Sequence, residues 1–149
     1  MDSDFDELEE LVMADMRRAY SEKAIDHAMN PRNVGSIPNA DGVARVTGPC
    51  GDTMEIWLKA KDGKLSDVAF WTDGCGSSIA CGSVLTELIS GRSIADARRV
   101  TPDDIISALG GLPEENVHCA LLAANTLKEA IRDYLALKSE PWKRAYRRL

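Results

Sequence analysis

The fold class follows from one stretch of the sequence, Met54-Glu-Ile-Trp-Leu-Lys-Ala-Lys-Asp-Gly-Lys-Leu-Ser-Asp-Val-Ala-Phe-Trp-Thr72. Apolar and polar residues alternate over residues 54–60, a period of two that is typical of a half-buried strand. The turn at residues 61–64 contains Gly63, which tolerates positive φ, so residues 65–72 are predicted to return as a second strand. Residues 43–47 can pair as a third. These short connections predict a small antiparallel three-stranded sheet.

Helices are predicted before and after the strands in the sequence. Residues 5–17 have apolar side chains at helical spacing with acids on the other side, and a second helix over residues 21–29 stops at Asn30-Pro31. Residues 33–42 form a loop. Ser77 or Ser78 is expected to cap a helix that runs to Ser90. Ser93 and Asp96 resemble a capping box for a short helix, and Thr101 is the expected N-cap of another that ends at Gly110. A long helix spans about residues 117–137. Five residues are expected to face inward from the long helix: Leu121, Leu122, Leu127, Ile131 and Leu135. Strands followed by helices predict an α+β domain with helices packed on one face of the sheet.

The length of 149 residues favours one domain, and its charge is unevenly placed. We expect residues 1–18 to be an acidic amphipathic N-terminal extension, residues 19–137 the domain, and residues 138–149 a basic C-terminal tail. Six acids and no base occupy the first ten residues, which leaves 18 acids against 18 bases elsewhere. A neutral body has no basic face for a phosphate backbone, so no nucleic acid is expected as a ligand. The basic residues of the tail are expected to lie on a solvent-exposed face of a helix: Lys143, Arg144, Arg147 and Arg148.

Two features of the sequence bear on location. It has no run of about 18 apolar residues, so we expect no membrane span. The acidic start is unlike a secretory or transit peptide, which begins with basic residues. We therefore expect an intracellular, cytoplasmic protein.

Three of the four cysteines lie at the ends of predicted elements. Cys50 is in a turn before a strand, Cys75 is in a turn between a strand and a helix, and Cys119 follows His118 at the start of the last helix. In a reducing compartment such cysteines indicate metal or thiol chemistry. Helix N-termini near Cys75 and Cys119 favour thiolates, and thiolates with imidazole suit zinc and iron–sulfur clusters. Because none of the spacings is a compact C-x-x-C, burial as small hydrophobic residues remains an alternative.

The fourth cysteine and the two histidines have weaker signals. Cys81 lies within the helix after Cys75 and is expected to serve packing. His27 is expected to cap a helix end. His118 diverges from Cys119 by about 100° around the helix, so we expect it to be a poor base for that thiol but an alternative ligand.

Several segments in order and at matching distances resemble the IscU/NifU-type scaffold proteins of iron–sulfur cluster assembly, from about Ala19 to Tyr134. The matching segments are Ala19-Tyr-Ser-Glu-Lys23, Asp26-His-Ala-Met-Asn-Pro-Arg-Asn-Val-Gly35, Cys50-Gly-Asp-Thr-Met54, Gly74-Cys-Gly-Ser-Ser-Ile-Ala80, Thr86-Glu87, and His118-Cys119 followed by Leu122-Ala123.

This resemblance implies a function. The family's cluster ligands fall on Cys50, Asp52, Cys75, His118 and Cys119. A cysteine desulfurase would deliver persulfide sulfur, with Cys119 as the favoured acceptor, and iron would complete a [2Fe–2S] cluster that passes to apo-proteins. Such a protein is a scaffold and sulfur acceptor, and it turns over no substrate by itself. Three thiolates with a carboxylate or an imidazole form an incomplete and weaker ligand shell, which suits a cluster that must leave.

Departures from the family pattern are informative. Residues 112–117 read Leu-Pro-Glu-Glu-Asn-Val where many bacterial members have Leu-Pro-Pro-Val-Lys, so we do not expect recognition by the specialised Hsp70 chaperone. Cys81 stands where the family usually has Ser. A zinc-holding sulfur acceptor could use the same residues, and a thiol hydrolase with Cys119 as nucleophile is a third hypothesis. The sequence leaves open whether the protein acts as a monomer or a homodimer.

Overall fold

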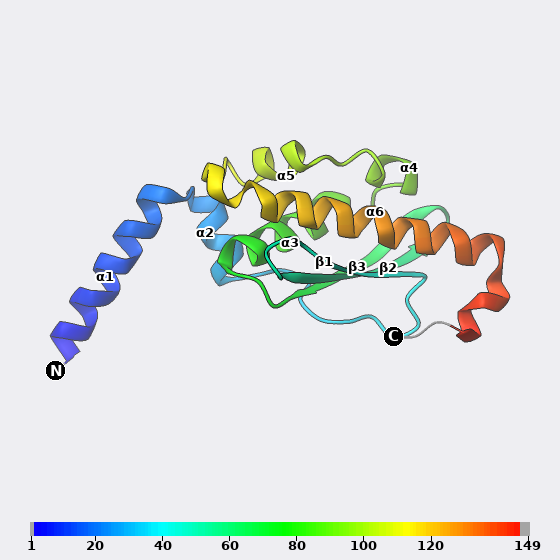
Figure 1. Cartoon of the computed structure of the whole chain (residues 1–149), viewed down its shortest axis with the longest axis horizontal. Coiled ribbons are helices and arrows are strands. Elements are labelled where there is room, and N and C mark those ends of the chain that lie inside the picture. Colours follow the sequence, from blue (N-terminus) through cyan, green and yellow to red (C-terminus); the bar gives the residue numbers. More distant parts are fainter. Residues whose placement is uncertain (1, 147–149) are drawn as a thin grey trace.

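A computed structural model describes residues 2–146 and contains the predicted three-stranded sheet (Figure 1). Strands β1 (Gly42–Thr47), β2 (Thr53–Lys61) and β3 (Lys64–Thr72) are antiparallel in the order β1-β2-β3. Ile56 pairs with Ala44 on one side and with Phe70 on the other. The alternation in residues 54–60 fixes this register because a shift by one residue would turn the apolar side chains to the opposite face.

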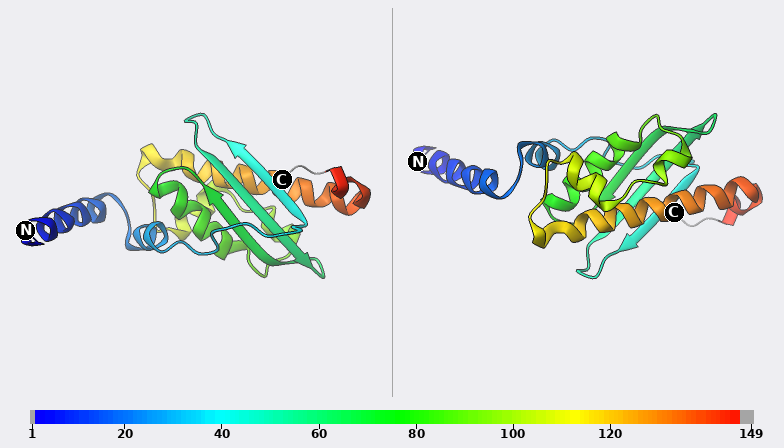
Figure 2. Two further views of the ribbon diagram at one scale, coloured as in Figure 1. Left: turned by 90° about the horizontal axis from the view of Figure 1, so that it is seen from below. Right: turned by 90° about the horizontal axis from the view of Figure 1, so that it is seen from above.

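The helices lie mainly on one face of this sheet, as expected (Figures 1 and 2). They are α1 (Asp2–Ala19), α2 (Glu22–Met29), α3 (Gly76–Ile89), α4 (Ile94–Ala97), α5 (Pro102–Ala108) and α6 (Val117–Ser139), with 3₁₀ turns η1 (Glu114–Asn116) and η2 (Pro141–Tyr146). Ser21, Ser93 and Thr101 cap α2, α4 and α5 as expected, but the reciprocal capping box is formed by Thr101 and Asp104 and not by the expected Ser93 and Asp96. Within residues 2–146, no helix combines the length and apolar character needed to cross a membrane.

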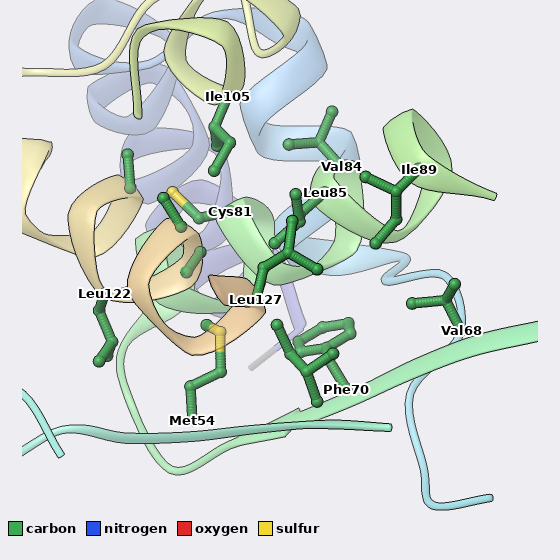
Figure 3. Close-up of a cluster of buried hydrophobic side chains, with 14 of the residues drawn as sticks. Met54, Val68, Phe70, Cys81, Val84, Leu85, Ile89, Ile105, Leu122 and Leu127 are labelled. Atoms are coloured by element: carbon green, nitrogen blue, oxygen red, sulfur yellow. The ribbon is translucent and has the colours of Figure 1, made fainter. Parts of the chain in front are cut away.

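The core lies between the sheet and α3, α5 and α6 (Figure 3). Met54 and Phe70 rise from the strands to meet Leu85 of α3 and Leu127 of α6, all of them buried. Gly82 lets α3 lie directly on the Phe70 ring, because a Cβ atom at this position would stand 2.3 Å from Phe70 Cδ2. Three residues link β3 to α3, so Cys75 at the N-terminus of α3 lies beside the end of β3.

Three sequence expectations need correction. Cys75 itself is the N-cap residue of α3, so Ser77 and Ser78 lie buried inside its first turn rather than capping it. Leu121 is 48% exposed, because the face that α6 buries includes Cys119, Ala120 and Leu122 and does not extend to it. The chain from residue 138 continues α6 only to Ser139 and then forms η2, so the tail is not one helix.

The two ends of the chain lie apart from the sheet. Helix α1 projects away from the rest of the fold (Figure 2), and Phe5, Leu8, Leu11 and Val12 on it are exposed. At the other end, Lys143 pairs with Glu140 and stands over the Trp142 ring. Arg147 and Arg148 of the expected basic tail lie outside the described residues.

Candidate functional site

Three segments that are distant in the sequence carry the candidate ligands: the β1–β2 loop, the β3–α3 turn and the start of α6. The backbone N–H of Thr53 donates to Asp73 Oδ1 at 2.8 Å, which joins the first two segments. The Gly48 N–H donates to the carbonyl oxygen of Asp52 at 2.8 Å, which closes the loop. Antiparallel pairing of β2 with β3 therefore brings the Asp52 and Cys75 segments together at one end of the sheet.

Ser78 connects the buried side of the site. Its Oγ lies 3.4 Å from Cys119 Sγ and 3.5 Å from Asp52 Oδ2, and the residue has no exposed surface. One hydroxyl proton serves only one acceptor at a time, so the thiol and the carboxylate share this donor. Sequence reasoning considered Ser78 only as a helix cap. The signal that could have identified it is its spacing of three residues from Cys75, which places both at the first turn of α3.

Cys75 is exposed, and its thiol is favoured as a thiolate. Burial raises the pKa of the thiol, but hydrogen bonds from the backbone N–H groups of Ser78 and Ser77 and from the Ser78 hydroxyl outweigh it and lower the pKa below its usual value. Unpaired N–H groups at a helix N-terminus stabilise negative charge in this way. The sequence expectation for Cys75 agrees with this environment.

Cys119 differs from that expectation. It is fully buried, and this burial raises the pKa of its thiol to about 11, with the nearby Cys75 and Asp52 acting in the same direction. The hydrogen bond from Ser78 lowers the pKa by less than burial raises it. The position near a helix N-terminus therefore does not make Cys119 a thiolate. Removal from water destabilises the charged thiolate by more than the helix N-terminus stabilises it. Cys119 and Cys75 lie close enough for each thiol to shift the pKa of the other.

His118 approaches its neighbour despite their divergence around the helix. Its Nε2 lies 3.6 Å from Cys119 Sγ, and its Nδ1 donates to the carbonyl oxygen of Glu115 at 3.0 Å. A carbonyl oxygen can only accept, so in the neutral ring Nδ1 carries the proton and Nε2 has its lone pair toward the sulfur. This arrangement is that of a ligand held in its binding tautomer.

Cys50 is exposed on the turn that closes where Gly51 N–H donates to the carbonyl oxygen of Gly48. Among residues 2–146, no group of three or more His, Cys, Asp or Glu side chains is close enough to hold a metal ion. The structure thus joins Cys75, Cys119, Asp52 and His118 through pairwise contacts, directly or through Ser78. The prediction that the Cys50 thiol joins them stays a prediction.

The remaining cysteine and histidine have structural environments. Cys81 is buried in the core beside α5 and α6 (Figure 3), which confirms the packing prediction, and burial raises the pKa of its thiol. His27 does not cap its helix, contrary to expectation. Its Nδ1 lies 2.7 Å from Ser83 Oγ and its Nε2 lies 3.2 Å from Glu87 Oε1, so it ties α2 to α3.

The described chain thus presents thiols, a carboxylate and an imidazole at one end of a three-stranded sheet in an α+β fold. The family model of the NifU-like N-terminal domain matches residues 19–140. The chain belongs to this family.

Relatives and solved structures agree with this assignment. The chain is 49% identical over 116 residues to the iron–sulfur cluster assembly scaffold protein IscU 1 of Archaeoglobus fulgidus, covering 77% of this chain and 76% of that protein. It is 46% identical over 121 residues to IscU of Escherichia coli, covering 78% and 94%. A crystal structure assigned to cluster assembly in the SUF system of Fervidobacterium islandicum has a TM-score of 0.61 at 26% identity, with 75% and 96% covered. A NifU-like N-terminal structure from Brucella abortus, at 22% identity and a TM-score of 0.60, covers 78% and 94% and shows the shared fold.

Proposed function

We propose that this protein is a scaffold on which a [2Fe–2S] cluster is assembled from iron and desulfurase-derived persulfide sulfur and then transferred to apo-proteins. The single observation that supports it most is the Ser78-centred contact, which gathers Cys119 and Asp52 beside Cys75 and His118. These are the donor types that bind iron–sulfur clusters, and the relatives named above are scaffold proteins.

Each residue has a distinct proposed role. Cys75 and Cys119 supply thiolates to iron, and Asp52 and His118 supply a carboxylate oxygen and an imidazole nitrogen. Cys50 completes the ligand set from its exposed turn, which requires the turn to bring its thiol inward when the cluster is assembled. A hard carboxylate beside soft thiolates weakens the hold on the cluster and so favours its release.

Cys119 is the proposed persulfide acceptor. The minor thiolate form of Cys119, whose pKa is raised to about 11, attacks the outer sulfur of a cysteine persulfide on the donor; the new S–S bond forms as the donor S–S bond breaks, and the donor cysteine leaves as a thiolate. Because Cys119 is buried and contacts the exposed Cys75, the incoming sulfur must pass Cys75 or the contact must open. The protein acts as an acceptor and scaffold, and the catalytic step that produces the persulfide belongs to the desulfurase.

A zinc-holding sulfur acceptor is the second candidate, favoured by one observation. The free lone pair of His118 Nε2 lies beside Cys119, and mixed imidazole and thiolate donors suit zinc. The thiol hydrolase hypothesis gains no support, because the apolar pocket at the first turn of α3 is lined by Cys75 and not by Cys119.

The other interaction predictions have less structural support. We propose a cysteine desulfurase and recipient apo-proteins as partners, a cytoplasmic location, and action as a monomer or a homodimer. Residues Glu114 and Glu115, which replace Pro and Val of the chaperone motif, are exposed on η1. Two charges on the surface that the chaperone would have to contact support the expectation that it does not bind.

Anaerobic reconstitution separates the two candidates. The protein is incubated with ferrous iron, cysteine and a catalytic amount of cysteine desulfurase, and then analysed by visible absorption and by iron, sulfide and zinc determination. The proposal predicts the absorption of a [2Fe–2S] cluster with equal amounts of iron and sulfide. Stoichiometric zinc that stays bound while no coloured cluster forms would favour the zinc-holding acceptor instead.

A further inference from the structure

An apolar pocket of about 230 Å³ opens beside Cys75. It lies where the end of α1 meets α2 and the first turn of α3, and its lining includes Met16, Tyr20, Ile25, Cys75 and Leu112. Apart from its rim, the pocket offers mainly hydrocarbon surface, so it fits a bulky apolar side chain. No proposed ligand other than Cys75 lines it, which makes it distinct from the cluster site while adjacent to one of its thiols.

One wall of the pocket is held in place by polar contacts. The Tyr20 hydroxyl accepts hydrogen bonds from Ser77 Oγ at 3.2 Å and from Asn116 Nδ2 at 2.7 Å. These bonds join the α1–α2 connection to α3 and to η1. The pocket is therefore a preformed feature of the fold, and a ligand entering it does not have to create it.

Helix α1 extends the pocket into an apolar stripe. Phe5, Leu8, Val12 and Met16 follow one another at intervals of three or four residues, so they share one helix face. The first three are 74%, 59% and 51% exposed, while Met16 lines the pocket. Because α1 projects from the fold (Figure 1), this stripe leads from the surface toward the Cys75 thiol.

Acidic residues border the stripe. Asp4 and Glu9 flank it on opposite sides by helical spacing, and the first ten residues contain six acids and no base. Apolar surface of this extent with a charged border is typical of a protein interaction site. The charge requires a partner segment that carries Lys or Arg beside its apolar side chains, because like charges at an interface are strongly unfavourable.

We propose that the stripe and the pocket form the docking site for the sulfur donor, which inserts a bulky apolar side chain from a basic segment next to Cys75. The inference rests on the proposed function and adds the surface that the donor contacts. A donor must reach Cys119, the proposed acceptor, from the exposed side of the site, and Cys75, the exposed thiol that interacts with Cys119, lies at this pocket. A recipient instead takes the cluster from all of its ligands, so a pocket at a single thiol suits the donor.

The test compares two routes of loading in the full chain. The variant Phe5→Ser/Leu8→Ser/Val12→Ser removes the stripe, and the control Met29→Ser/Val34→Ser removes exposed apolar residues that do not line the pocket. Each protein is given purified cysteine desulfurase with cysteine, and sulfur uptake is followed by mass spectrometry. Each is also reconstituted chemically with ferrous iron and sulfide, without donor. Circular dichroism checks that α1 remains helical.

We expect the stripe variant to lose uptake from the desulfurase by about tenfold or more, since buried apolar anchors dominate interface energies, and to match the parent in chemical reconstitution. The control should match the parent in both. Neutralising the border with Asp4→Asn/Glu9→Gln should lower uptake by less and reduce its sensitivity to salt.

The docking site would be wrong if the stripe variant took up sulfur from the desulfurase within about twofold of the parent, or if the control lost as much uptake as the stripe variant. Normal uptake by the stripe variant with slower cluster transfer to an apo-protein would also overturn it and would assign the surface to a recipient. Failure of chemical reconstitution in the parent itself is a different result and would count against the proposed function.

Discussion

Cys119 and Cys50 stand at opposite extremes of exposure within one candidate site. Cys119 is fully buried and contacts Ser78 and His118, whereas Cys50 lies exposed on the β1–β2 turn. We call the first group, Cys119 with Ser78, Asp52 and His118, the inner half of the site, and Cys50 with Cys75 the outer half.

The difference shows how one site could both hold and release a cluster. Hydrogen bonds among α3, α6, η1 and the β1–β2 loop position the inner half, although among the described residues its three donors are not close enough together to share a metal ion. The outer half is open to solvent and to partner proteins. A ligand shell that is rigid on one side and exposed on the other can be filled and emptied from the exposed side without disturbing the core.

The largest effect is expected when the inner thiol is removed. Cys119→Ser should abolish persulfide uptake and stable cluster assembly, because a serine hydroxyl is neither a sulfur acceptor nor a soft ligand. Cys50→Ser should still take up sulfur and lose mainly cluster retention. Mass spectrometry after incubation with a desulfurase and cysteine checks both, by the added mass of one sulfur atom. An equal adduct on the Cys119 variant and the parent would show that the inner thiol is not the acceptor.

An intermediate effect is expected at the carboxylate of the inner half. Asp52→Ala should slow cluster loss by about tenfold, since changes to the groups around a metal typically alter its binding by 10–100-fold and here the hard ligand is the labilising one. Release to a chelator, followed by the decay of visible absorption, measures the rate.

Ser78→Ala serves as the matched variant for the carboxylate, because it removes the hydroxyl shared by Asp52 and Cys119 but leaves both donors in place. Its release rate should stay closer to that of the parent. Release from the Asp52 variant at the parent rate would exclude a labilising role for this carboxylate.

The sheet and most of the helices could be predicted because their signals are local. Alternation over residues 54–60 and the N-cap at Thr101 act within a few residues, and both predictions are confirmed. The inward position predicted for Leu121 is wrong, because apolar character alone does not mark the edge of a buried helix face. Its exposure depends on how α6 lies against the sheet.

The sequence predicts which residue types make up the site, but it does not predict how deeply each is buried or what each one contacts. The sequence places Cys119 near a helix N-terminus, which favours a thiolate, and it does not show that α3 packs over the sulfur and removes water from it. Ser78 was missed for the same reason, since its partners are 26 and 41 residues away. Effects that depend on such long-range packing become visible only in the folded structure.

The smallest predicted effect is on stability and concerns His27, whose side chain ties α2 to α3. The Ser83 hydroxyl lies 2.7 Å from Nδ1 and also accepts from the Arg32 N–H, so its own proton points to the ring. Nε2–H then donates to Glu87 Oε1 at 3.2 Å. Burial, and secondarily the charge of Arg32, lower the pKa of His27 below its usual value of about 6.5, although Glu87 and Asp26 oppose them.

This shift makes the free energy of unfolding depend on pH in a defined direction. The unfolded chain binds the proton of His27 at a higher pH than the folded chain, so the stability contribution is complete above about pH 6.5 and declines as the pH falls below it. Urea unfolding between about pH 7.5 and pH 5.5 should show this decline in the parent. His27→Gln should be less stable at neutral pH and show a flatter profile. His118→Gln, at the only other histidine, should keep the slope of the parent. If His118→Gln flattens the profile and His27→Gln does not, the pH dependence belongs to the site rather than to the α2–α3 contact.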